Sequence, residues 1–267
     1  SCLAGLSQPA PGDFEIGLHG RIWSAQYCPA LRRKPDQRRL GSRNWERMNM
    51  ERTSRSQDAY QEILVMIGDG KLAPDNLLQE APLGAVLGMS RTPIREALRR
   101  IEANELAHRK GRFLRVRGPT PEEISEIFVL LDLLEPYCIR PAAETVHGQA
   151  MAAGLLVYPD MSGAPEPICA RTEIAVSRFL GETCTNSAIG QQVYELRCRL
   201  LPVGPALRGR AAHEALVAML SAISKGNENL ASQACHARLA AQATALLGAG
   251  LMGSKLNDIA DEKGRQA

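Results

Sequence analysis

Residues 88–101, with the sequence GMSRTPIREALRRI, constrain the fold of this chain more than any other stretch. Gly88 can end a preceding helix, Ser90 carries an oxygen suited to cap a new helix, and Pro93 is tolerated in a first helical turn. The sequence therefore predicts a helix that starts at Ser90. Its apolar side chains recur at three- and four-residue spacing and share one face, which consists of Ile94, Ala97, Leu98 and Ile101.

The other face of this helix is cationic, because the same spacing brings Arg91, Arg95 and Arg99 together. Guanidinium groups near a helix N-terminus, which itself attracts phosphate, suit a recognition helix that enters the major groove of DNA. The alternative is a solvated basic face on an ordinary surface helix. The neighbouring segments decide between these two interpretations.

Those segments predict a winged helix-turn-helix. Residues 59–69 have the pattern of a helix, 70–75 that of a turn containing Gly and Pro, and 79–87 that of a short helix. The inward side chains expected on the short helix are Leu83, Val86 and Leu87. After the recognition helix, residues 109–117 alternate apolar and basic side chains beyond a turn at Gly111, as a two-stranded wing does.

The run from Ser90 to Leu98 resembles the hallmark of GntR-type bacterial transcription regulators, Ser-Arg-Thr-Pro-(Val/Ile)-Arg-Glu-Ala-Leu. The resemblance extends over about residues 59–116 and implies a domain that binds double-stranded DNA. The chain departs from the family pattern where Asp75, Glu105 and Phe113 replace common glycines and where Gly84 replaces alanine. The DNA contacts are expected from the head of the recognition helix and from the wing, namely from Ser90, Arg91, Thr92, Arg95, Arg99, Gly111, Arg112 and Arg115.

Charge and composition divide the chain into several parts. Residues 90–118 hold nine Lys and Arg against three Asp and Glu, whereas residues 119–267 hold twelve against sixteen, so a basic reader precedes an acidic remainder. The basic, proline-containing residues 1–53 are expected to form a flexible extension, unless natural translation starts at Met48 or Met50. The expected domains are a DNA-binding domain at 54–118, a helical effector-binding and dimerisation domain at 119–250 and a tail at 251–267.

The second half of the chain has the pattern of an all-helical bundle. Residues 118–123 indicate a hinge that leads into a helix, with Thr120 as its cap and Pro121 in its first position. This helix is nearly apolar all round, and Pro136 and Pro141 are expected to kink or break it. Further helices are expected at about 168–184, 189–201, 211–224 and 230–247, with a turn at 225–227. The predicted fold class is mainly α: an N-terminal winged helix-turn-helix with a small β-wing, followed by an all-α bundle.

This half resembles the ligand-binding domain of the fatty-acid-regulator (FadR) branch of the family, which binds small carboxylic acids, often beside a divalent metal. The branch uses an Asp and a His four residues apart on one helix, then two His on later helices. His213 and His236 match the later positions, whereas Glu173 stands at the Asp position and Ser177 at the first His position. The resemblance therefore implies Glu173, His213 and His236 as ligands of a divalent metal such as Zn, Ni or Mn, bound weakly or not at all.

A carboxylate pocket without metal is the alternative for this site. In that case His213, His236 and either Arg197 or Arg199 would hold the effector through charge-assisted hydrogen bonds.

A DNA reader joined to a ligand-binding bundle predicts a transcription regulator. We expect a homodimeric, ligand-responsive repressor that binds a double-stranded operator and responds to a small organic acid. No catalytic residues are expected, because no nucleophile and base can be placed beside the two histidines, but a metal-dependent enzyme that uses them remains an alternative. A redox-sensing regulator is another alternative, although the seven cysteines form no Cys-x-x-Cys pair.

The sequence also bears on where the protein works. No uninterrupted apolar run reaches the length that spans a bilayer, so we expect no membrane partner. Cysteines without a disulfide framework suit reduced thiols, and a bacterial cytoplasmic, nucleoid-associated location is expected.

Overall fold

The computed structural model describes residues 43–157 and 169–251, with side chains from Arg55 onward. Most of the predicted extension at 1–53 and nearly all of the predicted tail at 251–267 lie outside these described residues. Within them, no helix is long and apolar enough to cross a membrane.

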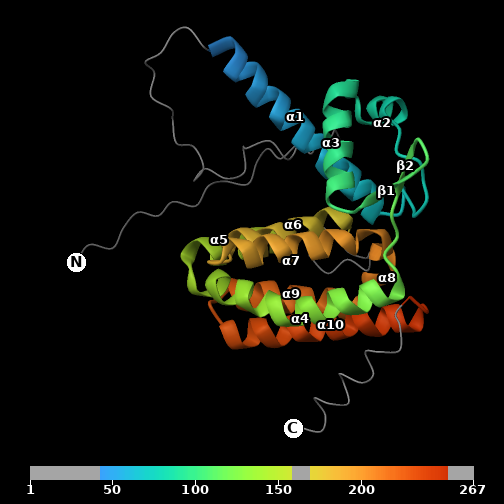
Figure 1. The fold of residues 1–267 in the computed structure, drawn as a ribbon. Coiled ribbons are helices and arrows are strands. Elements are labelled where there is room, and N and C mark those ends of the chain that lie inside the picture. Colours follow the sequence, from blue (N-terminus) through green and yellow to red (C-terminus); the bar gives the residue numbers. More distant parts are fainter. Residues whose placement is uncertain (1–42, 158–168, 252–267) are drawn as a thin grey trace, which may run out of the picture. The chain divides into compact units, whose positions relative to one another are not determined.

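The first elements form the expected winged helix-turn-helix (Figure 1). They are α1 (Arg43–Gly68), α2 (Glu80–Leu87), α3 (Arg91–Ala103), β1 (Ala107–Lys110) and β2 (Phe113–Val116). The boundaries of α2 and α3 agree with the sequence pattern, and Gly88 ends α2 in the left-handed conformation with φ of 63°. Helix α1 begins at Arg43, well before the start expected near Ala59.

The apolar stripe of α3 is buried as predicted. Its four members Ile94, Ala97, Leu98 and Ile101 are at most 6% exposed. They pack against Ile63 and Ile67 of α1 and against Leu83 of α2 in one hydrophobic cluster. The expectation that Val86 faces inward is wrong, because 69% of this residue is exposed. The short α2 contacts the core through one turn only, and Val86 lies on its outer side.

The wing is an antiparallel pair in which Ala107 lies opposite Val116 and Lys110 opposite Phe113. Gly111 makes the turn with φ of 64°, in the left-handed region where glycine has no steric cost. The segment between α1 and α2 pairs with β2 as a short third segment that the sequence did not indicate. Its Leu77 bridges to Arg115, and the Leu78 amide donates to the Leu114 carbonyl at 2.9 Å.

Two of the departures from the family's glycines lie at turns with unusual backbone angles. Asp75 has φ of 66° and Glu105 has φ of 57°, so each non-glycine residue occupies the left-handed region. This conformation costs an L-residue free energy, less for Asp than for Glu. The turn geometry is therefore kept although the glycine is absent.

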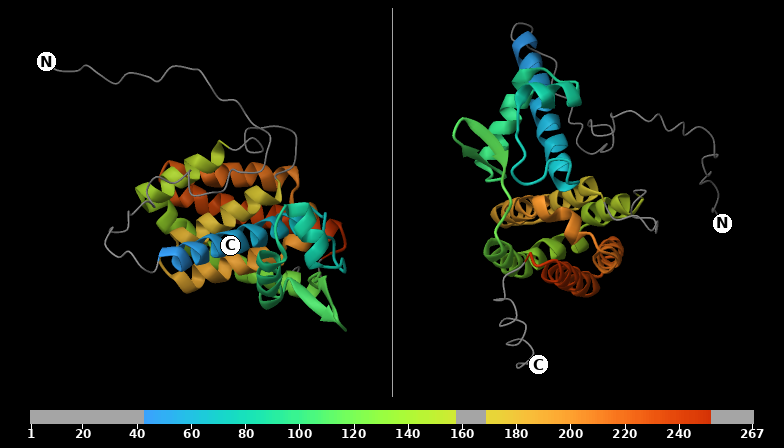
Figure 2. Two further views of the ribbon diagram at one scale, coloured as in Figure 1. Left: turned by 90° about the horizontal axis from the view of Figure 1, so that it is seen from above. Right: turned by 90° about the vertical axis from the view of Figure 1, so that its right-hand side faces the viewer.

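The second half is the predicted all-helical bundle, and in the described residues after β2 it contains no strand (Figure 2). Helices α6 and α7 pack side by side, as do α9 and α10. The elements are α4 (Pro121–Glu144), α5 (Val146–Leu156), α6 (Ala170–Thr183), α7 (Ser187–Arg199), a 3-10 turn (Leu201–Val203), α8 (Gly204–Leu207), α9 (Arg210–Ser224) and α10 (Glu228–Gly248). The 3-10 turn and α8 are too short to leave a periodic pattern.

Helix α4 starts as the sequence predicts. The Thr120 hydroxyl accepts from the Glu123 amide at 3.2 Å, and the Glu123 carboxylate accepts from the Thr120 amide at 2.9 Å. This reciprocal capping box satisfies two amides that the helix itself leaves free. The expectation that Pro136 or Pro141 breaks the helix is wrong, because α4 continues through both to Glu144.

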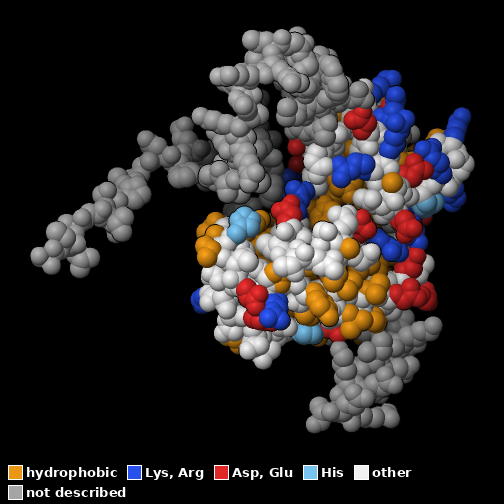
Figure 3. Space-filling view, turned by 60° about the vertical axis from the view of Figure 1, so that its left-hand side comes forward, with side chains coloured by type: hydrophobic (Ala, Val, Ile, Leu, Met, Phe, Trp, Pro, Cys, Tyr) orange, Lys and Arg blue, Asp and Glu red, His pale blue; other side chains and the backbone are white. Residues whose placement is uncertain are grey.

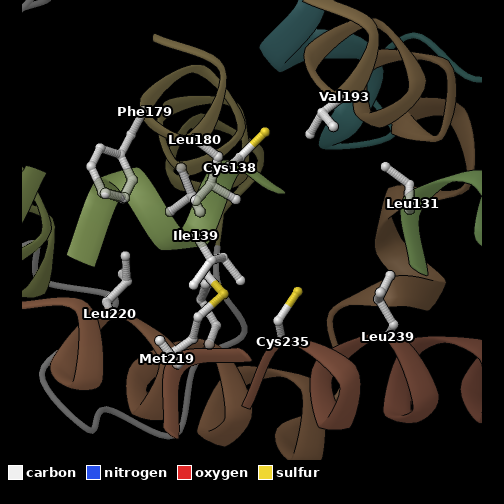
Figure 4. Packing of buried hydrophobic residues seen from close by; sticks show 14 of the residues in the cluster. Leu131, Cys138, Ile139, Phe179, Leu180, Val193, Met219, Leu220, Cys235 and Leu239 are labelled. Carbon is white, nitrogen blue, oxygen red and sulfur yellow. The ribbon is translucent and has the colours of Figure 1, made fainter. Parts of the chain in front are cut away.

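The core of the bundle is built from buried apolar side chains of α4 to α10, some of which are drawn in Figure 4. Leu131 and Ile139 come from α4, Phe179 from α6 and Met219 from α9. Helix α4 is not apolar where it is most buried, because Glu135 is fully enclosed. Its opposite side exposes Leu130, Leu133 and Tyr137.

Candidate nucleic-acid interface and bundle interior

The predicted DNA-contacting residues of α3 lie together at its exposed N-terminal part. Ser90 takes the N-cap position, but its side chain makes no capping hydrogen bond, which corrects the expected capping role. Arg91, Thr92, Arg95 and Arg99 are all exposed, on the side opposite the buried stripe. The helix therefore presents a cationic face and a free N-terminus to solvent.

Two arginines form bidentate pairs with carboxylates: Arg95 of the cationic face and Arg109 of the neighbouring wing. Arg95 donates from Nε and Nη2 to the two oxygens of Glu80 at 2.6 and 2.7 Å. Arg109 donates in the same way to the two oxygens of Glu102 at 2.6 and 3.0 Å. The hydrogen bond from Arg95 lowers the pKa of Glu80 from its ordinary value, so this carboxylate is ionised at neutral pH. Within the described part of the chain, Arg91, Arg99 and Arg112 make no ion pair.

A hollow of about 300 Å³ lies between α3 and the wing. Four guanidinium-bearing residues line it, namely Arg95, Arg99, Arg109 and Arg112. Arg112 lies over the ring of Phe113, with its guanidinium carbon 4.9 Å from the ring centre. Lys and Arg side chains gather on the surface of the winged helix-turn-helix in Figure 3, as expected for a surface that binds phosphate.

Arg115 was expected to contact phosphate, but its guanidinium is turned toward the protein. It is partly buried on β2, and its Nη1 donates to the carbonyl oxygen of Asp75 at 2.5 Å. Its Nε is buried without a hydrogen-bond partner among the described residues. Arg115 therefore fastens the segment before α2 to the wing, while Arg112 and the turn at Gly111 remain exposed.

The interior of the bundle holds a network of charged side chains. Arg197 of α7 donates from Nε and Nη2 to the two carboxylate oxygens of Glu135 at 2.5 and 2.8 Å. Its Nη1 donates to Gln242 Oε1 at 2.8 Å, and the Cys235 thiol donates to Glu135 at 3.2 Å. Burial alone raises the pKa of Glu135, but the charge and hydrogen bonds of Arg197 outweigh it and hold that pKa below the ordinary value.

A second buried pair joins α6 to α10. Arg238, only 1% exposed, donates from Nη2 to the Glu173 carboxylate. The Arg238 Nε is buried and has no hydrogen-bond partner among the described residues. Ser177 donates to the backbone carbonyl of Glu173 at 2.8 Å. Glu173, Ser177 and Arg197 line a cavity of about 30 Å³, which has room for only one or two water molecules.

The three predicted metal ligands do not form a metal-binding group. The described residues contain no cluster of three or more His, Cys, Asp and Glu side chains that could hold a metal ion. Glu173 faces Arg238, and His236 is 47% exposed in its side chain, with Nε2 3.6 Å from Asp132. The other ring nitrogen of His236 lies 2.8 Å from the Ser232 carbonyl. The described residues therefore do not bring Glu173, His213 and His236 together as a ligand set, and metal binding by them stays a prediction.

Of the two arginines proposed for the effector, only Arg197 lies in the interior. Arg199 lies beside the hinge, with Nη2 3.6 Å from Glu105 and 3.9 Å from Glu123. Arg117 of the hinge contacts the same two carboxylates. Arg199 thus belongs to a charge cluster between α7 and the turn before the wing, away from the interior where Arg197 lies, and its role as an effector ligand stays a prediction.

Sequence reasoning missed four members of the interior network: Glu135, Cys235, Arg238 and Gln242. A signal for Glu135 was present, because it is one of only two acidic residues, with Asp132, in the apolar run 127–139 of α4. Residues of this type are buried only when they are paired. Arg238 and Gln242 lie four residues apart on α10, a helix whose polar and apolar residues show no clear division.

The cysteines lie mostly in apolar surroundings. Cys138, Cys184, Cys198 and Cys235 are buried, and none of the cysteines in the described residues forms a disulfide. Burial raises the pKa of Cys198 to about 12 and that of Cys235 well above the ordinary value. Thiols with raised pKa values are poor nucleophiles, which does not favour the redox-sensing alternative.

The fold and the basic face together define the class of protein. A winged helix-turn-helix with a cationic recognition helix, followed by a helical domain, is the architecture of a DNA-binding transcription regulator.

Residues 55–113 match the family described as bacterial regulatory proteins, gntR family. No curated protein matches the chain. Among solved structures, the chain is similar to E. coli McbR/YncC, with 19% sequence identity and a TM-score of 0.57 over 73% of this chain and 98% of that chain. A transcriptional regulator described as GntR, from Rhodococcus sp. RHA1, has 22% identity and a TM-score of 0.49 over 72% of this chain and 98% of that one.

Residues 55–113 thus form a DNA-binding domain of the kind found in gntR-family regulatory proteins. The likeness to E. coli McbR/YncC shows that the fold extends through the helical domain, and the Rhodococcus likeness is too weak to add to this. The match to a family of regulatory proteins confirms the prediction of a regulator's DNA-binding domain at these residues.

Proposed function

We propose that this chain is a homodimeric, ligand-responsive repressor of the FadR branch, whose bundle senses a small carboxylate in the bacterial cytoplasm. The observation that carries the proposal is the buried guanidinium of Arg238, whose Nε–H has no acceptor among the described residues. A buried N–H without an acceptor is costly, and a carboxylate oxygen is the strongest acceptor that a small metabolite can supply.

The DNA-facing part of the proposal assigns two kinds of contact. The exposed and unpaired Arg91, Arg99 and Arg112 are suited to phosphate, which attracts mobile positive charge without regard to sequence. Ser90, Thr92 and Gly111 lie among them and can supply hydroxyl and amide donors to the same backbone. Arg95 projects from the middle of the exposed face and is assigned to base recognition.

Ligand binding requires the interior network to open. Pockets for small molecules enclose some 300 to 1,000 Å³, about ten times the cavity lined by Glu173 and Arg197 or more. An entering carboxylate therefore competes with Glu173 for Arg238 and separates α6 from α10. Glu135 and Arg197 can remain paired beside it, because their bidentate bond is complete.

The route from this network to the DNA-binding domain consists of paired charges. Arg171 of α6 contacts Glu62 of α1 at 2.8 Å, and Arg208 beyond α8 contacts Asp69 at 3.2 Å. The Ala170 amide at the start of α6 also donates to Asp69 at 3.1 Å. A displacement of α6 by the ligand is thus transmitted to the end of α1. A ligand that binds the displaced arrangement more tightly shifts the population of DNA-binding states.

The homodimer is proposed from the exposed face of α4. Leu130, Leu133 and Tyr137 are 42%, 60% and 65% exposed and follow one another at three- and four-residue spacing. Glu126 and Arg140 lie on the same face at equal distance in sequence on either side of Leu133. An antiparallel α4 from a second copy would bring each Glu126 to the other copy's Arg140, as a two-fold axis requires.

A metal-free site is proposed in place of the metal centre. Glu173 is committed to Arg238, and a guanidinium at that position replaces the positive charge that a metal ion would bring. Ser177 is occupied by the Glu173 carbonyl and is a poor metal ligand in any case.

The experiment measures two responses of the purified full chain to a panel of aliphatic mono- and dicarboxylic acids. One is the melting temperature, and the other is affinity for duplexes enriched by the protein from a random pool. An effector should raise the first and lower the second, and Arg238→Gln should abolish both responses while DNA binding persists. Arg210→Gln is the control, because it removes a guanidinium whose side chain is 93% exposed. Equal responses in Arg238→Gln and the original chain would refute the assignment.

A further inference from the structure

We propose that Glu80 is a positioning residue for DNA recognition, and that it orients Arg95 so that the outer edge of the guanidinium reads a guanine in the major groove. This inference rests on the DNA-binding function and on the assignment of Arg95 to a base. It adds a specificity determinant on α2, which is not the recognition helix.

The geometry of the pair supports this role. A guanidinium has two edges that can form parallel hydrogen bonds, one made by Nε and Nη2 and the other by Nη1 and Nη2. Glu80 occupies the first edge with bonds of 2.6 and 2.7 Å. The second edge remains free, and it is the edge that matches the O6 and N7 acceptors of guanine. Two bonds from one carboxylate fix both the position of the arginine and the plane of its guanidinium.

A role in folding accounts poorly for the pair. The side chains of Arg95 and Glu80 are 54% and 31% exposed, and ion pairs at such positions add little to stability. Glu80 does lie in the first turn of α2, where an acidic residue is favourable, but that benefit requires no arginine.

The negative charge of Glu80 also has a cost for DNA binding. A carboxylate beside the hollow between α3 and the wing repels phosphate and lowers affinity for every sequence. Arg91, Arg99 and Arg112 provide attraction that does not depend on Glu80. A carboxylate at this position benefits DNA recognition only if its gain in sequence discrimination exceeds its loss of affinity. Preorganisation of Arg95 provides such a gain.

The same pairing occurs once more at this surface. Arg109 at the start of the wing uses Nε and Nη2 on Glu102, which leaves its outer edge free as well. Arg112, in contrast, lies over Phe113. The surface thus combines two guanidinium groups oriented by carboxylates, those of Arg95 and Arg109, with the guanidinium of Arg112, which no carboxylate of the described residues holds.

The test is enrichment of a random 30-bp duplex pool by the full chain, followed by sequencing and by measurement of affinity for one fixed, unenriched duplex. The variants are Glu80→Ala, Arg95→Lys and the double variant. Glu80→Ala should reduce the preference for guanine at one position of each half-site about tenfold. It should also raise affinity for the unenriched duplex, since one negative charge is removed. Loss of a purely structural residue would lower both.

The double variant separates positioning from other effects. Lysine cannot make the two parallel bonds, so Arg95→Lys should lose the same guanine preference, and adding Glu80→Ala should cause no further loss. Glu122→Ala is the matched control, because it removes an exposed carboxylate from the first turn of α4 and should leave the guanine preference unchanged.

The outcomes distinguish the inference from the function beneath it. Enrichment of the same sequences to the same extent by Glu80→Ala and the original chain would overturn the positioning role. Independent, additive losses in the double variant would also overturn it. Failure of the original chain to enrich any sequence would instead contradict sequence-specific DNA binding. The melting temperature of Glu80→Ala would show whether that variant unfolds. In that case Arg95→Lys still decides whether Arg95 reads a guanine. The inference is refuted if Arg95→Lys keeps the full guanine preference of the original chain.

Discussion

The substitution Glu135→Leu leaves the guanidinium of Arg197 in the bundle core without a counter-charge. Glu135 is fully buried, and the Arg197 side chain is 5% exposed, so water cannot replace the lost partner. Removal of one member of a buried pair typically costs about 3 to 5 kcal/mol, because the remaining charge stays desolvated. The total free energy of unfolding of a domain is only about 5 to 15 kcal/mol, so this loss is a large fraction of it.

The assay is thermal unfolding of the full chain, with urea unfolding as a second measurement. A loss of about 3 to 5 kcal/mol at roughly 2 to 4 °C per kcal/mol predicts a fall in melting temperature of about 6 to 20 °C. Glu144→Leu provides the control, since it removes a carboxylate from an exposed pair with Arg140 on the same helix. That variant should melt close to the original chain.

A double variant tests the reasoning behind the magnitude. Glu135→Leu combined with Arg197→Met replaces the pair by apolar groups and should recover most of the lost stability. The argument is refuted if Glu135→Leu alone melts within about 2 °C of the original chain. It is equally refuted if the double variant is less stable than Glu135→Leu, because the unpaired charge would then not be the cause.

The same pair predicts a pH dependence with a definite sign. The pKa of Glu135 in the folded chain is lowered, so the unfolded chain binds the proton more readily. The contribution of the pair is therefore complete above the ordinary glutamate pKa of about 4.3 and is lost as the pH falls through the lowered folded pKa. The difference in stability between the original chain and Glu135→Leu should shrink only in acid.

The remaining predictions concern the wing, the dimer and the metal. Arg112→Ala should weaken binding to all duplexes alike and reduce the salt dependence by about one counterion, which titration at several salt concentrations will measure; a loss confined to one sequence would contradict the phosphate contact. If the proposed dimer forms through α4, Leu133→Glu should convert it to a monomer in sedimentation, whereas Leu247→Glu, at another exposed apolar residue, should not. Zn or Ni should raise the melting temperature little, and an increment that persists in His213→Ala with His236→Ala would contradict any role of these histidines.

The DNA-binding domain could be predicted closely because its signals are local. The buried stripe of α3 and the turn at Gly111 each depend on residues within a few positions of one another. The cap at Thr120, at the start of the bundle, is local in the same way. The pairing of Leu77 with the wing was missed for the opposite reason. Leu77 bridges to Arg115, which follows two helices later in the sequence, and nothing near Leu77 indicates the pairing.

The bundle interior was predicted less well because charge pairing is a long-range property. Glu135 and Arg197 lie on α4 and α7, and Glu173 and Arg238 on α6 and α10. The resemblance to the FadR branch implied Glu173 as a metal ligand, whereas in the structure its carboxylate pairs with Arg238 of another helix. The sequence near Glu173 does not indicate this arginine, which lies 65 residues further along the chain.

Helix geometry could have decided between Arg197 and Arg199 without a structure. Two residues apart on an α-helix are separated by about 200° around its axis, so they cannot face one pocket. The neighbours Val193, Leu196 and Leu200 indicate the buried side of α7, and Arg197 falls within it while Arg199 falls outside. The observed positions follow this rule: Arg197 pairs with Glu135 in the core, and Arg199 lies near Glu105 in the turn before the wing. One helix therefore carries a residue of the interior charge network and, two positions later, a residue of the charge cluster beside the wing.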